Sequence, residues 1–154
     1  MSHDARLAEL GLALPEAAAP VAAYVPTVEV GGLLHVSGQL PFQDGALMTG
    51  RVGADRDADY GQAAAERCGM MVLAQVAKAL GGSLDRVERV VKLGVFVNSA
   101  ADFGGQPAVA NGASELMVRV FGEAGKHSRS AVGVPALPFG AVVEVDAVIA
   151  IRPA

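Results

Sequence analysis

Residues 128–151 read SRSAVGVPALPFGAVVEVDAVIAI, and this stretch decides the fold that we expect for the chain. It begins with a cation, Arg129, crosses a turn rich in proline and glycine, and ends in strictly alternating residues. Successive side chains of a strand point to opposite faces, so one face over 143–151 carries only valine, alanine and isoleucine. Glu144 and Asp146 lie on the other face, beside small apolar neighbours.

Carboxylates on a partly apolar face need a partner or a chemical task. Arg129 precedes Glu144 by fifteen residues, across the proline-rich turn, and is the natural candidate to lie nearby. We therefore expect Arg129 and Glu144 to face one small cavity, where the arginine holds a carboxylate and the glutamate manages a water. For Asp146, one step further along the same face, we expect a structural or subunit-contact role.

The composition predicts one globular domain over residues 1–154, with 1–19 as an N-terminal helix and connector. Hydrophobic residues make up 52% and charged residues 18%, enough to bury a large core. The net charge is -4 and the 12 Lys and Arg are scattered, which argues against a nucleic-acid partner. The single cysteine, Cys68, excludes an internal disulfide and fits a reducing compartment.

Targeting, membrane and metal signals are weak. The charged first residues are unlike a signal peptide, and no apolar run reaches the roughly 18 residues of a membrane helix, so we expect a cytoplasmic protein without a membrane partner. The three histidines show no ligand spacing, and no metal or cofactor is expected. Acidic residues at 55, 57 and 59 loosely resemble a calcium loop but fit better as caps of the helix that follows.

The order of elements predicts an α+β fold with both main helices on one face of the sheet. The strands at 90–97 and 141–151 are apolar on both sides, yet only two long helices are available to cover them. The uncovered face is then a binding surface or the contact of a homo-oligomer. The expected elements are a short helix at 3–12, a hairpin at 28–37 turning at Gly31-Gly32, a polar loop at 41–57, a helix at 59–80, a strand at 90–97, a helix at 108–121 and a strand at 141–151.

Several short motifs together resemble the RidA/YjgF family, also called the L-PSP endoribonuclease or reactive-intermediate deaminase family. The resemblance covers roughly residues 20–152 in the expected element order. The combination of an S-G-Q-x-P piece with R-S, L-P and V-E-V-D-A pieces is specific, whereas either part alone is weak. The motifs are Tyr24-Val25-Pro26, the LHVSGQLP run at 34–41, the strand at 91–98 followed by Asp102-Phe103, Arg129-Ser130, Leu137-Pro138 and the VEVDA run at 143–147.

The resemblance implies a chorismate-mutase-like fold, with a mixed sheet and two main helices packed on one face. It also implies a homotrimer whose sheets line a central barrel and whose three clefts lie between subunits. In active members each cleft hydrolyses the enamine or imine of a 2-oxo acid and releases ammonia. For the present chain, the resemblance implies a small carboxylate substrate, with no cofactor and no nucleic-acid partner.

Site residues follow from the same resemblance. Arg129 matches the arginine that grips the substrate carboxylate, and Glu144 the glutamate near the imine carbon and its water. Tyr24 matches a tyrosine that closes the cleft, and Asn111 an asparagine of the second helix. The backbone around Gly38 and Ala131 forms the rest of the wall. Ala131 replaces a frequent cysteine, and the next-but-one position, often acidic, is a glycine here, which marks a divergent branch.

Two interpretations of the same residues remain open. Arg129 and Glu144 could neutralise each other as an ordinary ion pair, or Arg129 could bind a ligand while Glu144 transfers protons. The chain is then an imine deaminase or a non-catalytic trimer that binds small carboxylates. An endoribonuclease fits poorly with a pI near 5.3.

Overall fold

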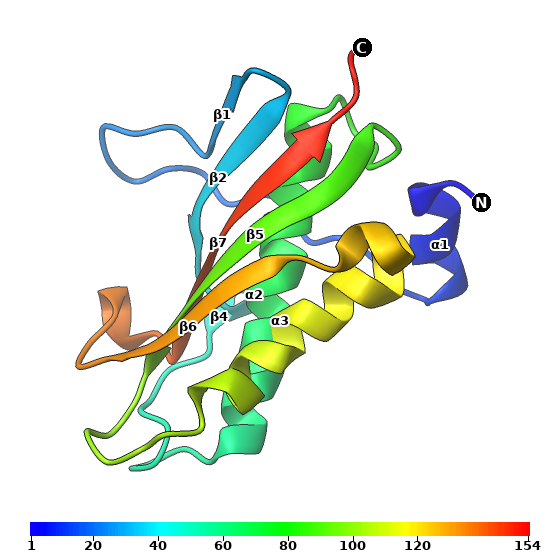
Figure 1. Ribbon diagram of the computed structural model, residues 1–154. Coiled ribbons are helices and arrows are strands. Elements are labelled where there is room, and N and C mark those ends of the chain that lie inside the picture. Colours follow the sequence, from blue (N-terminus) through cyan, green and yellow to red (C-terminus); the bar gives the residue numbers. More distant parts are fainter.

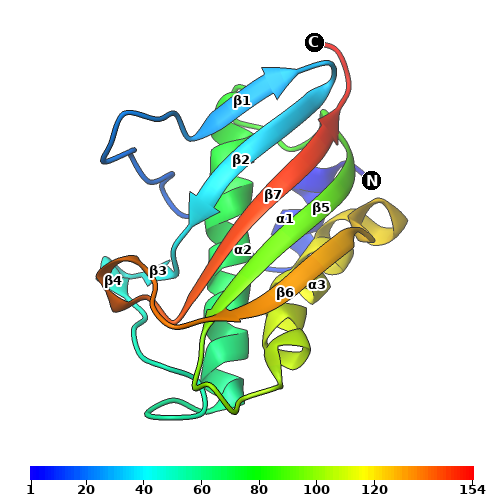
Figure 2. The same ribbon diagram turned by 60° about the vertical axis from the view of Figure 1, so that its left-hand side comes forward.

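The computed structural model describes all 154 residues and contains one five-stranded sheet in the order β1-β2-β7-β5-β6. The long helices α2 (Ala58–Ala79) and α3 (Gln106–Phe121) cover one face of this sheet, as Figures 1 and 2 show. The other face carries no helix. The predicted α+β class and the placement of both helices on one face are confirmed. The strands are β1 (Thr27–Val30), β2 (Leu33–Gln39), β5 (Val87–Asn98), β6 (Ser128–Val134) and β7 (Val143–Ile151).

The β1–β2 hairpin turns at Gly31-Gly32, as predicted. Both glycines have positive φ, 59° and 76°, which is the backbone of the tight turns that suit the strand twist. Beyond the hairpin, β2 pairs antiparallel with β7, and its register shifts between Val36 and Gln39. The irregular segment contains Gly38, which becomes important at the site.

The two helices begin and end close to their predicted limits. Asp57 caps α2 by accepting a hydrogen bond from the Tyr60 amide at 2.8 Å, which confirms the capping role. Gly112 lets the helices cross closely, because an added Cβ there would lie 2.0 Å from the Gln62 carbonyl oxygen. The α2–α3 pair therefore forms a tightly packed layer beneath the sheet.

Strand β6 was absent from the predicted order of elements. It pairs parallel with β5, and Leu93 stands opposite Arg129. Parallel strands are joined by long connections, here the whole of α3, so the pairing leaves no local signal. Its sequence, SRSAVGV, also lacks the alternation that identified β7. Arg129 consequently lies on an edge strand and not in a loop.

The predicted loop at 41–57 contains a further small hairpin. Strands β3 (Phe42–Gln43) and β4 (Ala46–Leu47) pair around Asp44 and Gly45, whose φ angles are 52° and 78°. Asp-Gly is a strong turn signal, but two-residue strands are too short to show an apolar pattern.

The core lies between the sheet and the two helices. Cys68 on α2 is fully buried there, with its Sγ 3.5 Å from the Val143 carbonyl oxygen. Burial, and then the charge of Glu144, raise the pKa of the thiol well above its ordinary value, so Cys68 is a core residue. On the uncovered face of the sheet Val28, Val30 and Val132 stay exposed, which confirms the expected apolar surface.

Helix α1 (His3–Glu9) is shorter than predicted and packs against the end of α3. His3 contacts the Val87 carbonyl oxygen at 3.0 Å, and Asp4 accepts from the Leu84 amide at 2.9 Å. Residues 10–26, which we call the strap, then cross the molecule to reach β1. None of the helices combines the length and the apolar character that a membrane span requires.

Candidate functional site

Arg129 and Glu144 do not face one cavity within the chain. Arg129 stands opposite buried Leu93 and contacts α3, so it lies on the helix side of the sheet. Glu144 stands opposite Phe96, between buried valines, and therefore lies on the uncovered side. Strand β5 also separates their strands. Within one chain, therefore, the two residues neither share a cavity nor form an ion pair.

Arg129 is held by two side chains of α3. Its Nη1 donates to Asn111 Oδ1 at 2.8 Å and to Ser114 Oγ at 3.1 Å. No hydrogen bond within the chain uses Nε or Nη2, the edge that binds a carboxylate bidentately. The guanidinium is therefore fixed by one nitrogen and open at the other two.

A histidine continues this network. His127 Nδ1 lies 2.6 Å from the Gly125 carbonyl oxygen, and its Nε2 lies 2.9 Å from Ser114 Oγ. A carbonyl can only accept, so Nδ1 carries the proton and Nε2 accepts from the Ser114 hydroxyl. The hydroxyl oxygen is then free to accept from Arg129. Burial first, and the nearby Arg129 charge next, lower the pKa of His127, which favours this neutral form.

Ala131 completes the region that we call the arginine cluster: Arg129, Asn111, Ser114, His127 and Ala131. It lies two residues beyond Arg129 on the same face of β6 and packs against the core. Its side chain is smaller than the cysteine expected at this position from the family resemblance.

Glu144 lies over a glycine of the neighbouring strand. A Cβ added to Gly38 would be 2.2 Å from Glu144 Oε1, so any larger residue there would displace this carboxylate. No cation of the chain pairs with it, since the ion pairs join Arg6 to Glu9, Arg119 to Glu66 and Lys126 to Glu123. Burial, and then repulsion from Asp146, raise the pKa of Glu144. A carboxylate without a cation partner and with a raised pKa can take up and release a proton more readily than an ion-paired one.

Asp146 repeats the arrangement on the other neighbouring strand. A Cβ at Gly94 of β5 would be 2.3 Å from Asp146 Oδ1. Burial raises the pKa of Asp146, against the opposing effects of a hydrogen bond with the Gly94 backbone and the charge of Lys92. The two acids therefore lean in opposite directions, Glu144 toward β2 and Asp146 toward β5.

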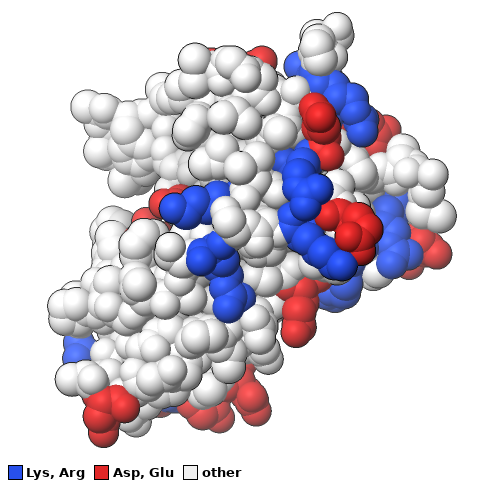
Figure 3. All heavy atoms as spheres, viewed as in Figure 1, with Lys and Arg blue, Asp and Glu red and all other residues white.

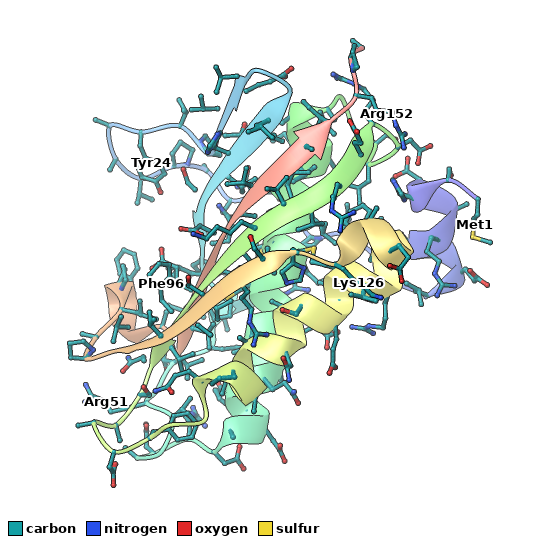
Figure 4. All side chains as sticks on the ribbon, in the orientation of Figure 1. Met1, Tyr24, Arg51, Phe96, Lys126 and Arg152 are labelled. Carbon is teal, nitrogen blue, oxygen red and sulfur yellow. The ribbon has the colours of Figure 1, made fainter.

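Tyr24 lies in the strap, 48% exposed, and lines a hollow to which Gly38 also contributes. We call Tyr24, Gly38 and Glu144 the glutamate cluster. In Figure 4, Tyr24 of the glutamate cluster lies beside the β1 edge of the sheet. Lys126, which directly precedes His127 of the arginine cluster, lies just before β6 at the opposite edge. The predicted residues thus form two groups at different places on one chain.

Ser114, His127, Gln39 and Gln75 were not among the predicted site residues. His127 is one of the three histidines without metal-ligand spacing. A signal for Ser114 existed, because Asn111 and Ser114 are three apart and share one face of α3. No pattern in the sequence indicated that this face would meet β6.

Similarity to known proteins extends over nearly the whole chain. Residues 4–150 match the family profile described as "YjgF/chorismate_mutase-like, putative endoribonuclease". Protein TCP17 of Trypanosoma cruzi is 57% identical over 147 residues, covering 94% of this chain and 91% of that protein.

Two solved structures illustrate the range of similarity. Atu1372 of Agrobacterium tumefaciens, of unknown function, is 49% identical with a TM-score of 0.90, covering 97% of this chain and 92% of that one. RidA of the Antarctic bacterium Psychrobacter sp. PAMC 21119 is 33% identical with a TM-score of 0.60, covering 88% and 94%.

Proposed function

The chain belongs to the YjgF/chorismate-mutase-like family, in which RidA also falls, and from this premise we propose that it hydrolyses imines and enamines of 2-oxo acids. The reaction converts a 2-imino acid and water into a 2-oxo acid and ammonia. The observation that carries the proposal is that the chain presents both an arginine fork held in position and a carboxylate of raised pKa without a cation partner.

Arg129 would bind the substrate carboxylate through its free Nε and Nη2. Each hydrogen bond between charged groups contributes about 1.5–3 kcal/mol, enough to orient a small acid. Asn111 and Ser114 keep the guanidinium in place, so little ordering remains when the substrate arrives.

Glu144 would perform the proton transfers. Water adds to the imine carbon while the carboxylate takes one of its protons, and that proton passes to the nitrogen. The resulting carbinolamine then expels ammonia as its hydroxyl becomes the new carbonyl, with Glu144 again moving the proton. Imines are already electrophilic, so orientation and proton transfer suffice, and the steps need no redox partner.

The two clusters would meet between subunits of a homotrimer. They lie on different faces of the sheet, and β5 separates the strands of Glu144 and Arg129, so one chain alone offers two half-sites. The apolar uncovered face, with Val28, Val30 and Val132 exposed, supports burial against further copies. A cyclic assembly would bring the glutamate cluster of one subunit to the arginine cluster of the next.

A non-catalytic carboxylate-binding trimer is the second candidate. The observation that favours it is that the arginine cluster is complete without Glu144. Ala131 and Gly133, where relatives often carry cysteine and an acidic residue, point the same way. For the endoribonuclease of the family description, support is weaker. In Figure 3 the Lys and Arg side chains near the middle of the face are interspersed with acidic ones, without the continuous basic stripe of an RNA path.

The test is ammonia release from freshly generated 2-iminopropionate. Wild type is expected to accelerate it, whereas Arg129→Ala and Glu144→Gln lose the acceleration. Glu66→Gln, which removes a surface carboxylate paired with Arg119, serves as the matched control and keeps it. A folded wild type without acceleration, or a fully active Glu144→Gln, would overturn the deaminase proposal. Carboxylate binding that persists in Glu144→Gln but not in Arg129→Ala would then support the binding protein.

A further inference from the structure

A hollow opens beside Gly38, between the strap and the end of β2. Its volume is about 170 Å³. In Figures 1 and 2 the strap loops outward next to β1, and the upper left of Figure 3, over these elements, is almost free of charged side chains. The lining residues are Ala18, Ala19, Pro20, Val21, Tyr24, Pro26, Gly38, Gln39, Leu40, Phe42, Gln75 and Phe139.

Two buried amides interrupt this otherwise apolar lining. Gln39 is 6% exposed and Gln75 is 2% exposed. Gln75 Nε2 donates to the Ala18 carbonyl oxygen at 2.7 Å and lies 3.4 Å from Gln39 Oε1. Gln39 Nε2 donates in turn to the Ser37 carbonyl oxygen at 3.0 Å. Both amide nitrogens therefore have partners in the chain.

The carbonyl oxygen of Gln75 has none. No hydrogen bond of the chain ends on its Oε1, although the side chain is almost fully buried and lines the hollow. Asn98 Oδ1 is the only fully buried side-chain acceptor without a partner, so Gln75 Oε1 is in contact with the open space of the hollow. A hydrogen-bond donor that enters the hollow can therefore reach it. A ligand with an apolar body and a donor at its far end would supply that donor.

The hollow adjoins the proposed reaction centre. Gly38 borders the hollow and also lies directly beneath the Glu144 carboxylate. Tyr24 belongs to the same wall. A substrate whose imine carbon lies at Glu144 can therefore extend its side chain past Gly38 into the hollow.

We propose that the hollow is the side-chain pocket of the site, and that it selects 2-imino and 2-oxo acids with a large apolar side chain ending in a hydrogen-bond donor, such as a hydroxyphenyl group. The selection rests on the proposed function, because it places the carboxylate at Arg129 and the imine carbon at Glu144. Gln75 is the specificity residue: its Oε1 accepts from the donor of the side chain.

The competing role for Gln75 is to tie the strap to α2 through Ala18, with no ligand involved. The two roles predict different patterns of affinity. A loosened strap weakens the binding of all large ligands alike, whereas a lost acceptor weakens only those that carry the donor.

The experiment measures dissociation constants of non-reacting 2-oxo acids by titration calorimetry. The probes are pyruvate, phenylpyruvate and 4-hydroxyphenylpyruvate. Wild type is expected to bind phenylpyruvate more tightly than pyruvate by about tenfold or more, because an apolar ring leaves water. The hydroxyl is expected to add roughly a further two- to tenfold, the range of a net hydrogen bond.

Two variants test the assignment. Gln75→Met keeps the length of the side chain but removes the acceptor, and is expected to abolish the advantage of 4-hydroxyphenylpyruvate over phenylpyruvate. Val21→Phe partly fills the hollow at a position that is 81% exposed, so folding is not at risk. It is expected to lower the affinity ratio of phenylpyruvate to pyruvate.

The outcomes separate the pocket from the reaction. Equal affinities for pyruvate and phenylpyruvate overturn the pocket, even if 2-iminopropionate is deaminated. A preference for the hydroxyl that survives in Gln75→Met overturns the role of Gln75. The expected ranking without any turnover supports the pocket and contradicts the deaminase proposal alone.

Discussion

Arg129 and Glu144 belong to one sheet, but the chain holds them in different ways. Arg129 has its partners within the chain, through Asn111, Ser114 and, beyond the hydroxyl, His127. Glu144 has no side-chain partner and is placed by the space over Gly38 and by partial burial. The charge for recognition is thus preorganised, while the reactive carboxylate is left free to change its protonation state.

The largest expected effect concerns where the two clusters meet. Arg129→Ala and Glu144→Gln chains, each inactive alone, are mixed after unfolding and refolded together. If a site takes its arginine from one subunit and its glutamate from another, about a quarter of the interfaces in an equal mixture are intact. We expect about that share of wild-type ammonia release, checked at matched protein concentration.

A mixture as inactive as its parents would show that both residues act from one subunit, against the two half-sites described above. The oligomeric mass, measured by light scattering, must match that of wild type for this comparison. A monomeric wild type would contradict the inter-subunit site directly.

A second test moves Glu144 without replacing it. Gly38→Ala places a methyl group where the carboxylate lies, so we expect turnover to fall by roughly 100-fold, because a misplacement of about 1 Å can cost that much. Gly94→Ala is the matched control, because it crowds Asp146 in the same way, 2.3 Å from Oδ1. Equal losses in two variants of unchanged mass would mean that Glu144 has no special role.

A third test loosens Arg129 while keeping its charge. Ser114→Ala removes the acceptor at 3.1 Å from Nη1. A net hydrogen bond contributes about 1 kcal/mol, so KM for the imine, or Kd for a 2-oxo acid, should rise roughly three- to tenfold. We expect kcat to change little, and Ser114→Thr to restore the affinity. A fall in kcat with an unchanged KM would place Ser114 in the chemistry and not in positioning.

The smallest effects are opposite pH dependences of stability. The pKa of His127 is lowered in the folded chain. Below about pH 6.5 the unfolded chain therefore binds a proton that the folded chain does not bind. Stability from this group therefore falls as the pH drops. The raised pKa of Glu144 means that above about pH 4.3 the unfolded chain has released a proton that the folded chain still holds. Stability from this group falls as the pH rises through the raised pKa.

Urea unfolding between pH 4 and 8, at one protein concentration, checks both signs. We expect His127→Asn to reduce the loss of stability on the acid side, and Glu144→Gln to reduce the loss as the pH rises. Midpoints of Glu144→Gln that run parallel to those of wild type would contradict the raised pKa of Glu144.

The sequence predicted those elements whose signals are local. The helix expected at 59–80 is α2, because Asp57 caps its start and Gly81-Gly82 follow its end. The alternation over β7 correctly separated Glu144 from the core. The sequence offers only two long helices, and this number also predicted that one apolar face of the sheet would lack a covering helix.

The position of Arg129 was not foreseeable in the same way. Its face is decided by the register of β6 against β5, where Arg129 stands opposite Leu93 across a connection that contains α3. The network through Ser114 and His127 depends on the same nonlocal pairing. Sequence motifs thus selected the candidate residues, while the sides of the sheet on which they lie required the three-dimensional arrangement.

The buried Cys68 can report how often the core of the molecule opens locally. Its thiol is the only one in the chain and has no exposed surface, so an alkylating reagent reaches it only while α2 separates from the sheet. The labelling rate in native buffer then reports how often α2 separates from the sheet. Cys68 contacts the carbonyl of Val143, which directly precedes Glu144. A ligand that stabilises this end of β7 would therefore lower the labelling rate of Cys68, with no mutation needed to detect it.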